Sequence, residues 1–66
     1  MQIKLNKKEK KLPENSSLDD LISLLKLNVQ SIVIEVNLNI IKKENWKNFI
    51  LKDSDSVEII TFMGGG

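Results

Sequence analysis

Every second residue of positions 2–6 is apolar, which is the pattern of a β-strand with one buried face. The polar residues 7–9 predict a turn, and residues 10–12 predict a short return strand. Pro13 ends that strand, because proline has no N–H to donate to a strand ladder. The chain is therefore expected to open with a β-hairpin.

The next segment has the period of a helix. Its apolar residues recur at i, i+3, i+4 and i+7, which places them in one stripe that should pack on a sheet. They are Leu18, Leu21, Ile22 and Leu25. Ser17 predicts the N-cap, and Asp20 completes a capping box in which Asp replaces the preferred Glu. The helix is expected to span residues 18–26.

The middle of the chain predicts two strands joined by a turn. Residues 31–37 form a nearly continuous β-branched run, which favours a central strand buried on both faces. Residues 37–39 predict a turn, and residues 40–41 begin another short strand.

The last third predicts a short helix and a final strand. Residues 43–47 fit a single helical turn that folds Trp46 and Phe49 inward, and a lone Trp is more often core than ligand platform. Residues 56–63 predict the final strand. The order ββ–α–β–β–short helix–β is typical of an α+β roll, with a mixed sheet packed against one main helix. We expect the first and last strands to be parallel neighbours at its centre.

All three glycines of the chain are its last three residues, Gly64, Gly65 and Gly66. A glycine run is thin and conformationally free, so it can thread a narrow channel and present an unhindered carboxyl group to another protein's active site. Four extended residues reach roughly 13 Å beyond the sheet. The alternatives to this functional interpretation are that the glycines are a frayed terminus or a remnant of expression. We therefore divide the chain into a folded domain, residues 1–63, and a flexible tail, residues 64–66.

Composition argues against an enzyme. The 66 residues include no Cys and no His, which removes thiolate chemistry, the commonest general base and the commonest metal ligand. Asp53 and Asp55 lie in a polar turn, and without a His beside them they do not predict a metal site.

Charge and hydropathy argue against several partners. A net charge of +1 predicts neither a nucleic acid nor a membrane as partner. The lysines of residues 7–11 allow a docking patch, but such a run is more often a solvated turn. No apolar run has the length of a membrane span or of a signal peptide, so we expect a soluble, cytoplasmic protein.

With these segments in view, the chain resembles the ubiquitin-like β-grasp sulfur carriers, in particular the ThiS branch that serves thiazole formation in thiamine biosynthesis. The similarity covers essentially the whole chain. Its segments are Met1-Gln2-Ile3 with Asn6, residues 17–22, residues 33–37, residues 41–46 and residues 55–66. Two positions depart from the family, which often has Gly where this chain has Lys7 and Ser54. Both departures should affect turns that favour positive φ.

The resemblance implies a division of labour between the chain and its partners. It assigns the working group to the carboxylate of Gly66, which an E1-like adenylating enzyme activates with ATP. Sulfur from a cysteine desulfurase relay then displaces AMP, and the resulting thiocarboxylate donates sulfur to thiazole synthase. The chain itself is implied to be a protein co-substrate that binds no cofactor.

The same resemblance assigns partner binding to the tail and its root. Gly65 and Gly64 would give a slim approach, while Met63 and Phe62 would anchor the root. As apolar residues at a strand end, Met63 and Phe62 also fit a core role.

Two other functions stay open at this point. A carrier of the same class could serve molybdopterin synthesis, tRNA thiolation or protein conjugation. A different class, a small protein-interaction domain, would treat the glycines as an inert linker.

Overall fold

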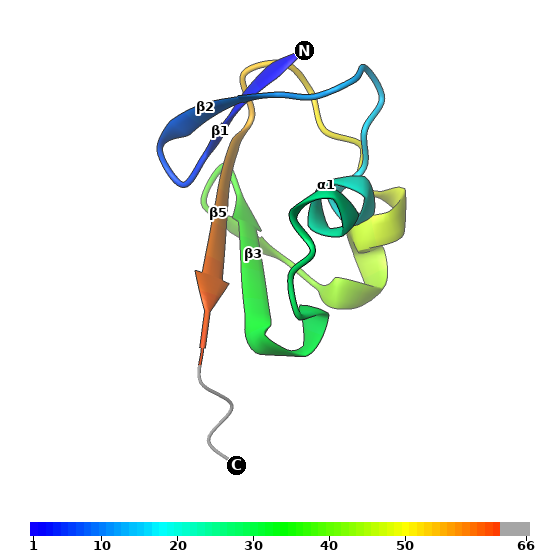
Figure 1. The fold of residues 1–66 in the computed structure, drawn as a ribbon, viewed down its shortest axis with the longest axis vertical. Coiled ribbons are helices and arrows are strands. Elements are labelled where there is room, and N and C mark those ends of the chain that lie inside the picture. The colour runs from blue at the N-terminus through cyan, green and yellow to red at the C-terminus, as the bar shows by residue number, and fades with distance from the viewer. Residues whose placement is uncertain (63–66) are drawn as a thin grey trace.

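The computed structural model describes residues 1–62, in which a five-stranded mixed sheet packs one face against a single α-helix (Figure 1). The elements are β1 (Gln2–Leu5), β2 (Lys8–Lys11), α1 (Leu18–Leu25), the 3-10 helix η1 (Val29–Ser31), β3 (Ile32–Val36), β4 (Asn39–Ile41), the 3-10 helix η2 (Lys43–Asn48) and β5 (Ser56–Thr61). The predicted element order is confirmed, with η1 as the addition that the pattern did not indicate. No helix within residues 1–62 is long and apolar enough to cross a membrane.

The two ends of the chain meet in the middle of the sheet. The strand order is β2-β1-β5-β3-β4, with β5 parallel to β1 and antiparallel to β3. Lys4 lies opposite Ser56 and Leu5 opposite Val57, which confirms the predicted central pairing of the first and last strands.

Helix α1 begins as its sequence predicts. The Asp20 N–H donates to Ser17 Oγ at 3.0 Å, and the Ser17 N–H donates to Asp20 Oδ2 at 2.9 Å. This reciprocal capping box satisfies N–H groups that the first turn leaves unpaired, and Asp suits the positive end of the helix dipole. The helix ends at Leu25, one residue earlier than expected, because Lys26 takes the left-handed conformation of a C-cap.

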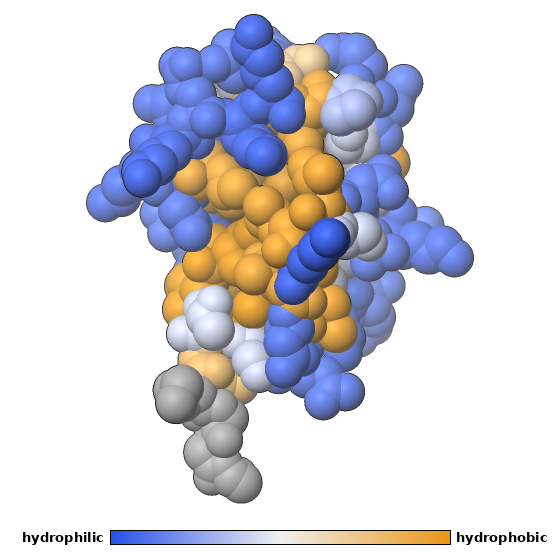
Figure 2. All heavy atoms as spheres, viewed as in Figure 1, coloured by the Kyte–Doolittle hydropathy of each residue, from blue (hydrophilic) through white to orange (hydrophobic). Residues whose placement is uncertain are grey.

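A single apolar core lies between α1 and the sheet. Its buried members are Ile3, Leu12, Leu18, Leu21, Ile22, Ile32, Ile34, Val36, Trp46, Leu51 and Val57. Trp46 is 3% exposed, and its Nε1 donates to the Ile41 carbonyl at 2.9 Å, so it fills the core with its polar atom satisfied. Half-buried apolar residues surround this core, and Figure 2 shows apolar side chains gathered over the middle of one face.

The expectation that β3 is buried on both faces is wrong. Ile32, Ile34 and Val36 are buried beneath α1, whereas the alternate residues Val33 and Glu35 are half-buried on the opposite face. The helix covers only one face of the sheet, and β-branched residues favour strands on either face. The run of apolar residues therefore indicated a strand but not how many of its faces are covered.

Both hairpins turn within two residues, which also corrects the expected boundaries. Asn6 and Lys7 have φ of 49° and 71°, and Asn37 and Leu38 have φ of 51° and 73°. Two residues with positive φ form the type I′ turn, whose twist matches that of the flanking strands. Lys8 and Asn39 consequently belong to strands and not to the turns that were predicted.

The two positions where the family often has Gly are positions of positive φ in this chain. Lys7 has φ of 71° and Ser54 has φ of 72°. A residue with a Cβ is strained there by roughly 1–2 kcal/mol relative to the right-handed region. The chain therefore stores backbone strain in turns that a glycine would relax.

Lys7→Gly should stabilise the fold by about 0.5–1 kcal/mol, because relief of the left-handed strain exceeds the entropy that glycine adds to the unfolded chain. The matched control Lys8→Gly, one residue later in β2, should destabilise by a similar amount. Urea unfolding measures both changes. A Lys7→Gly protein less stable than the parent chain would contradict the assignment of strain to this turn.

Candidate functional site

The end of β5 is where the predicted site begins. Phe62 is the last residue that the structure describes, and it directly follows β5. The other four predicted site residues, Met63, Gly64, Gly65 and Gly66, lie outside the described residues. The structure therefore describes the base from which the predicted tail departs.

Hydrogen bonds hold this base on both sides. On the β3 side, the Phe62 N–H donates to the Ser31 carbonyl at 2.9 Å. On the β1 side, the Ile59 N–H donates to Asn6 Oδ1 at 2.8 Å. Since β1 pairs with β5 only as far as Val57, the Asn6 side chain takes the place of the next backbone acceptor. The strand is thus held for most of its length before the tail begins.

Phe62 does not belong to the core. Its side chain is 45% exposed, and Ile60, two residues earlier on the same face of β5, is 46% exposed. Val57, near the start of the strand, is fully buried. The strand therefore runs from a buried residue to an exposed aromatic residue, and the predicted role of Phe62 in partner binding stays a prediction.

The two acids of the polar turn before β5, Asp53 and Asp55, stabilise the fold through hydrogen bonds. Asp53 Oδ1 accepts from the Gln2 N–H at 2.8 Å, and Asp55 Oδ2 accepts from the Lys52 N–H at 2.8 Å. Asp55 Oδ1 also accepts from Asn37 Nδ2 at 3.1 Å. Within residues 1–62, no three His, Cys, Asp or Glu residues come together as metal ligands.

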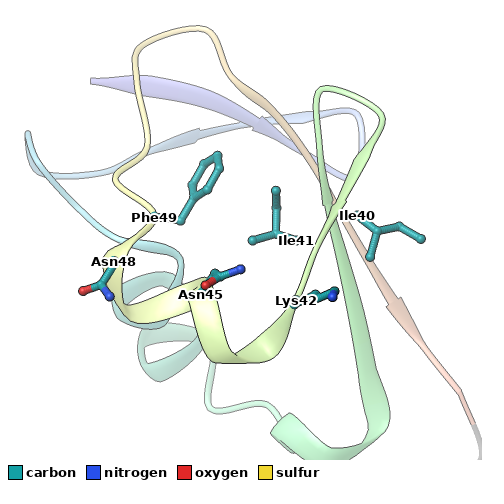
Figure 3. Close-up of a pocket in the computed structure, with 6 residues that line it drawn as sticks. All are labelled: Ile40, Ile41, Lys42, Asn45, Asn48 and Phe49. Carbon is teal, nitrogen blue, oxygen red and sulfur yellow. The ribbon is translucent and has the colours of Figure 1, made fainter.

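A hollow of about 520 Å³ lies between β4 and η2, but its lining does not converge on a reactive centre. It is lined by Ile40, Ile41, Lys42, Asn45, Asn48 and Phe49. Figure 3 shows Ile40 and Ile41 pointing to opposite sides of β4, with Asn48 directed away from them. Strand β3 separates this hollow from β5, so it is not part of the tail's base.

In the sequence, Asn6 is one of the residues that carry the family resemblance, but no structural role could be predicted for it. Its contact to Ile59 spans 53 positions of sequence, and no local pattern indicates such a contact. The available signal was its place at a hairpin turn, where Asn tolerates positive φ and its amide oxygen is free to accept.

Taken together, a β-grasp sheet with a central C-terminal strand and a side-chain-free tail defines a carrier of the ubiquitin-like type. The ThiS family model matches residues 2–66. The chain therefore belongs to the ThiS family, whose members are sulfur carriers of thiamine biosynthesis and not enzymes.

Individual relatives agree with this assignment. The sulfur carrier protein ThiS of Bacillus subtilis is 34% identical over 65 residues, which cover 97% of this chain and 98% of the relative. The crystal structure of the thiamine biosynthesis protein ThiS from Geobacter metallireducens superposes with a TM-score of 0.87 at 30% identity, with both chains fully covered. A thiazole synthase of Paramagnetospirillum magneticum is 27% identical over all 66 residues, which span only 20% of that longer chain.

Asn6→Gly should weaken the tail's base without straining the turn, because glycine accepts positive φ but has no side-chain oxygen. Loss of one such hydrogen bond costs about 1 kcal/mol, so the Ile59 amide should exchange with solvent about fivefold faster. Asn6→Asp keeps the acceptor and serves as the control. Unchanged exchange at Ile59 in Asn6→Gly, measured by NMR, would show that this contact does not hold β5.

Proposed function

We propose that the Gly66 carboxylate carries sulfur to thiazole formation as a thiocarboxylate. The observation that carries the proposal is the family match, which extends through the tail to Gly66. The central position of β5 supports it, because a base held on both sides presents the tail from one place on the molecule.

The chemistry requires activation by a partner. A carboxylate is a poor electrophile, so it first attacks the α-phosphorus of ATP on an E1-like enzyme, and pyrophosphate leaves. A persulfide from a cysteine desulfurase relay then attacks the acyl carbon, and AMP leaves. A thiol of that relay reduces the resulting acyl disulfide, which frees the thiocarboxylate and oxidises the thiols to a disulfide.

The chain contributes access and not catalysis. Gly64 and Gly65 have no side chain beyond hydrogen, so the terminal acyl group can reach a confined active site. Phe62 and Met63 anchor the root against the partner. The sulfur acceptor is thiazole synthase, and the relative from Paramagnetospirillum magneticum supports this partner, because a segment similar to the whole chain is joined to an enzyme of that name.

Gly65→Val should slow conversion about a hundredfold or more, because a branched side chain misplaces the acyl group in a confined site. Conversion is followed by intact mass as one oxygen is replaced by sulfur, with ATP, the adenylating enzyme and a sulfur source present. Thr61→Val is the control, since it places the same side chain on an exposed strand position that favours it. Equal conversion rates for Gly65→Val and the parent chain would refute the narrow-channel argument.

Deletion of Gly66, or addition of one residue after it, should abolish conversion altogether, because the reacting carboxylate is then displaced by one residue. The same mass measurement reports it. A deleted or extended chain that still gains sulfur would show that Gly66 is not the site.

A further inference from the structure

A hollow of about 420 Å³, separate from the one beside β4, lies between the β1–β2 hairpin and the end of α1. Lys10 lies opposite the buried Ile3 on β1. Lys8 lies opposite Leu5 in the same way, so both lysines share the face of the sheet that the helix covers. We define the basic groove as the residues that line this hollow, which are Leu5, Asn6, Lys8, Glu9, Lys10 and Leu25.

The basic groove has an apolar floor and a cationic rim. Leu5 and Leu25 are half-buried against the core, so part of each side chain stays open. Lys8 is exposed and Lys10 is half-buried, as is typical of a lysine whose stem covers apolar surface while its ammonium stays in water. In Figure 2, hydrophilic residues of the hairpin border the apolar surface in the middle of the face shown.

The acids near the two lysines are engaged elsewhere. Among residues 1–62, the only ion pair joins the N-terminal ammonium to Glu14, so neither Lys8 nor Lys10 is paired with a carboxylate there. Glu9 alternates with the two lysines along β2, which turns it to the opposite face of the sheet. Its carboxylate accepts a hydrogen bond from Gln2 Nε2.

Helix α1 does not neutralise the groove. Its acids, Asp19 and Asp20, lie in the first turn, whereas Leu25 ends the helix and is followed by Lys26. The last turn adds the negative end of the helix dipole, about half a charge, which the lysines outweigh. The basic groove therefore keeps an excess of positive charge.

Charge and apolar surface together decide what occupies the groove. A second copy related by two-fold symmetry would bring the same lysines against each other. A nucleic acid would supply phosphates but no aliphatic side chain for the floor. The fitting occupant is a protein segment that presents an apolar side chain beside Asp or Glu.

The proposed chemistry requires two proteins at one tail. The adenylating enzyme holds the acyl group when the persulfide arrives, so the sulfur donor needs a different surface of the domain. The groove lies on the helix side of the sheet, whereas Phe62 follows the alternation of β5 to the other face. Asn6 connects the groove to Ile59, and seven extended residues, as many as separate Ile59 from Gly66, span at most roughly 25 Å.

We infer that the basic groove is the docking surface for the cysteine desulfurase that supplies sulfur, an inference that rests on the proposed function. The desulfurase binds there through an acidic segment with an apolar side chain. Docking in the groove leaves the base of the tail to the adenylating enzyme, so the persulfide and the activated acyl group can meet in one complex.

The test compares two sulfur sources in the presence of the full chain, the adenylating enzyme and ATP. One source is cysteine with a subsaturating amount of purified desulfurase, and the other is sulfide. Sulfide attacks the acyl carbon directly and AMP leaves, so sulfide requires no docking surface. The rate of thiocarboxylate formation is measured by intact mass.

The double variant Lys8→Gln/Lys10→Gln should gain sulfur from the desulfurase about tenfold more slowly than the parent chain. Lys8→Glu/Lys10→Glu should be slowed about a hundredfold, since repulsion then replaces attraction. Both variants should gain sulfur from sulfide at the parent rate, which shows that they are folded and adenylated normally.

Two controls accompany these variants. Lys8→Arg/Lys10→Arg keeps both charges and should keep the parent rate. Lys43→Gln/Lys47→Gln removes the same charge from exposed positions in η2, which follows the opposite edge strand of the sheet, and should also react at the parent rate.

Equal rates with the desulfurase for Lys8→Gln/Lys10→Gln and the parent chain would overturn the inference. An equal slowing with sulfide would overturn it too, because the lysines would then act on the adenylating enzyme or on the chain's own carboxylate. So would a parent chain that gains sulfur from sulfide but never from the desulfurase. A parent chain that gains sulfur from neither source would instead count against the proposed function.

Discussion

The parallel pairing of β1 with β5 is the interaction on which the rest of the molecule depends. It joins the two ends of the chain at the centre of the sheet and leaves β5 with a strand on each side. Where β1 ends, Asn6 continues the pairing through its side chain. A terminal segment would ordinarily fray. Here the described end of the chain leaves directly from a central strand that is paired on both sides.

Several polar side chains of the chain stabilise the fold through hydrogen bonds to the backbone. Asn6, Asn37, Asp53 and Asp55 all accept backbone N–H groups that the short strands and tight turns leave unpaired. A domain this small buries only about 60% of the surface of its unfolded chain, so such local bonds matter to its stability. In the proposed function, the chemistry falls to the terminal glycine, and the reactive thiols and the nucleotide come from partners.

Sequence reasoning predicted what periodicity and caps determine, and it missed what depends on tertiary contact. The Ser17 cap, the helical stripe, Trp46 as core and the central pairing of the end strands were all predicted correctly. The number of covered faces of β3 was predicted wrongly, because the apolar character of Val33 does not reveal whether a helix covers its face. The sequence also could not predict that Glu35 and Glu58 lie opposite each other, because this depends on the register between strands that are distant in sequence. Gly64–Gly66, assigned from composition and resemblance, remain a prediction.

The state of Gly66 in the cell tests the account most directly. The chain should be purified from its source under non-reducing conditions, treated with a reagent selective for thiocarboxylates, and analysed by intact mass and C-terminal sequencing. The account predicts a population that ends at Gly66 and carries sulfur in place of one carboxyl oxygen. A chain that continues past Gly66, or one whose terminus never carries sulfur while thiazole is being made, would contradict it.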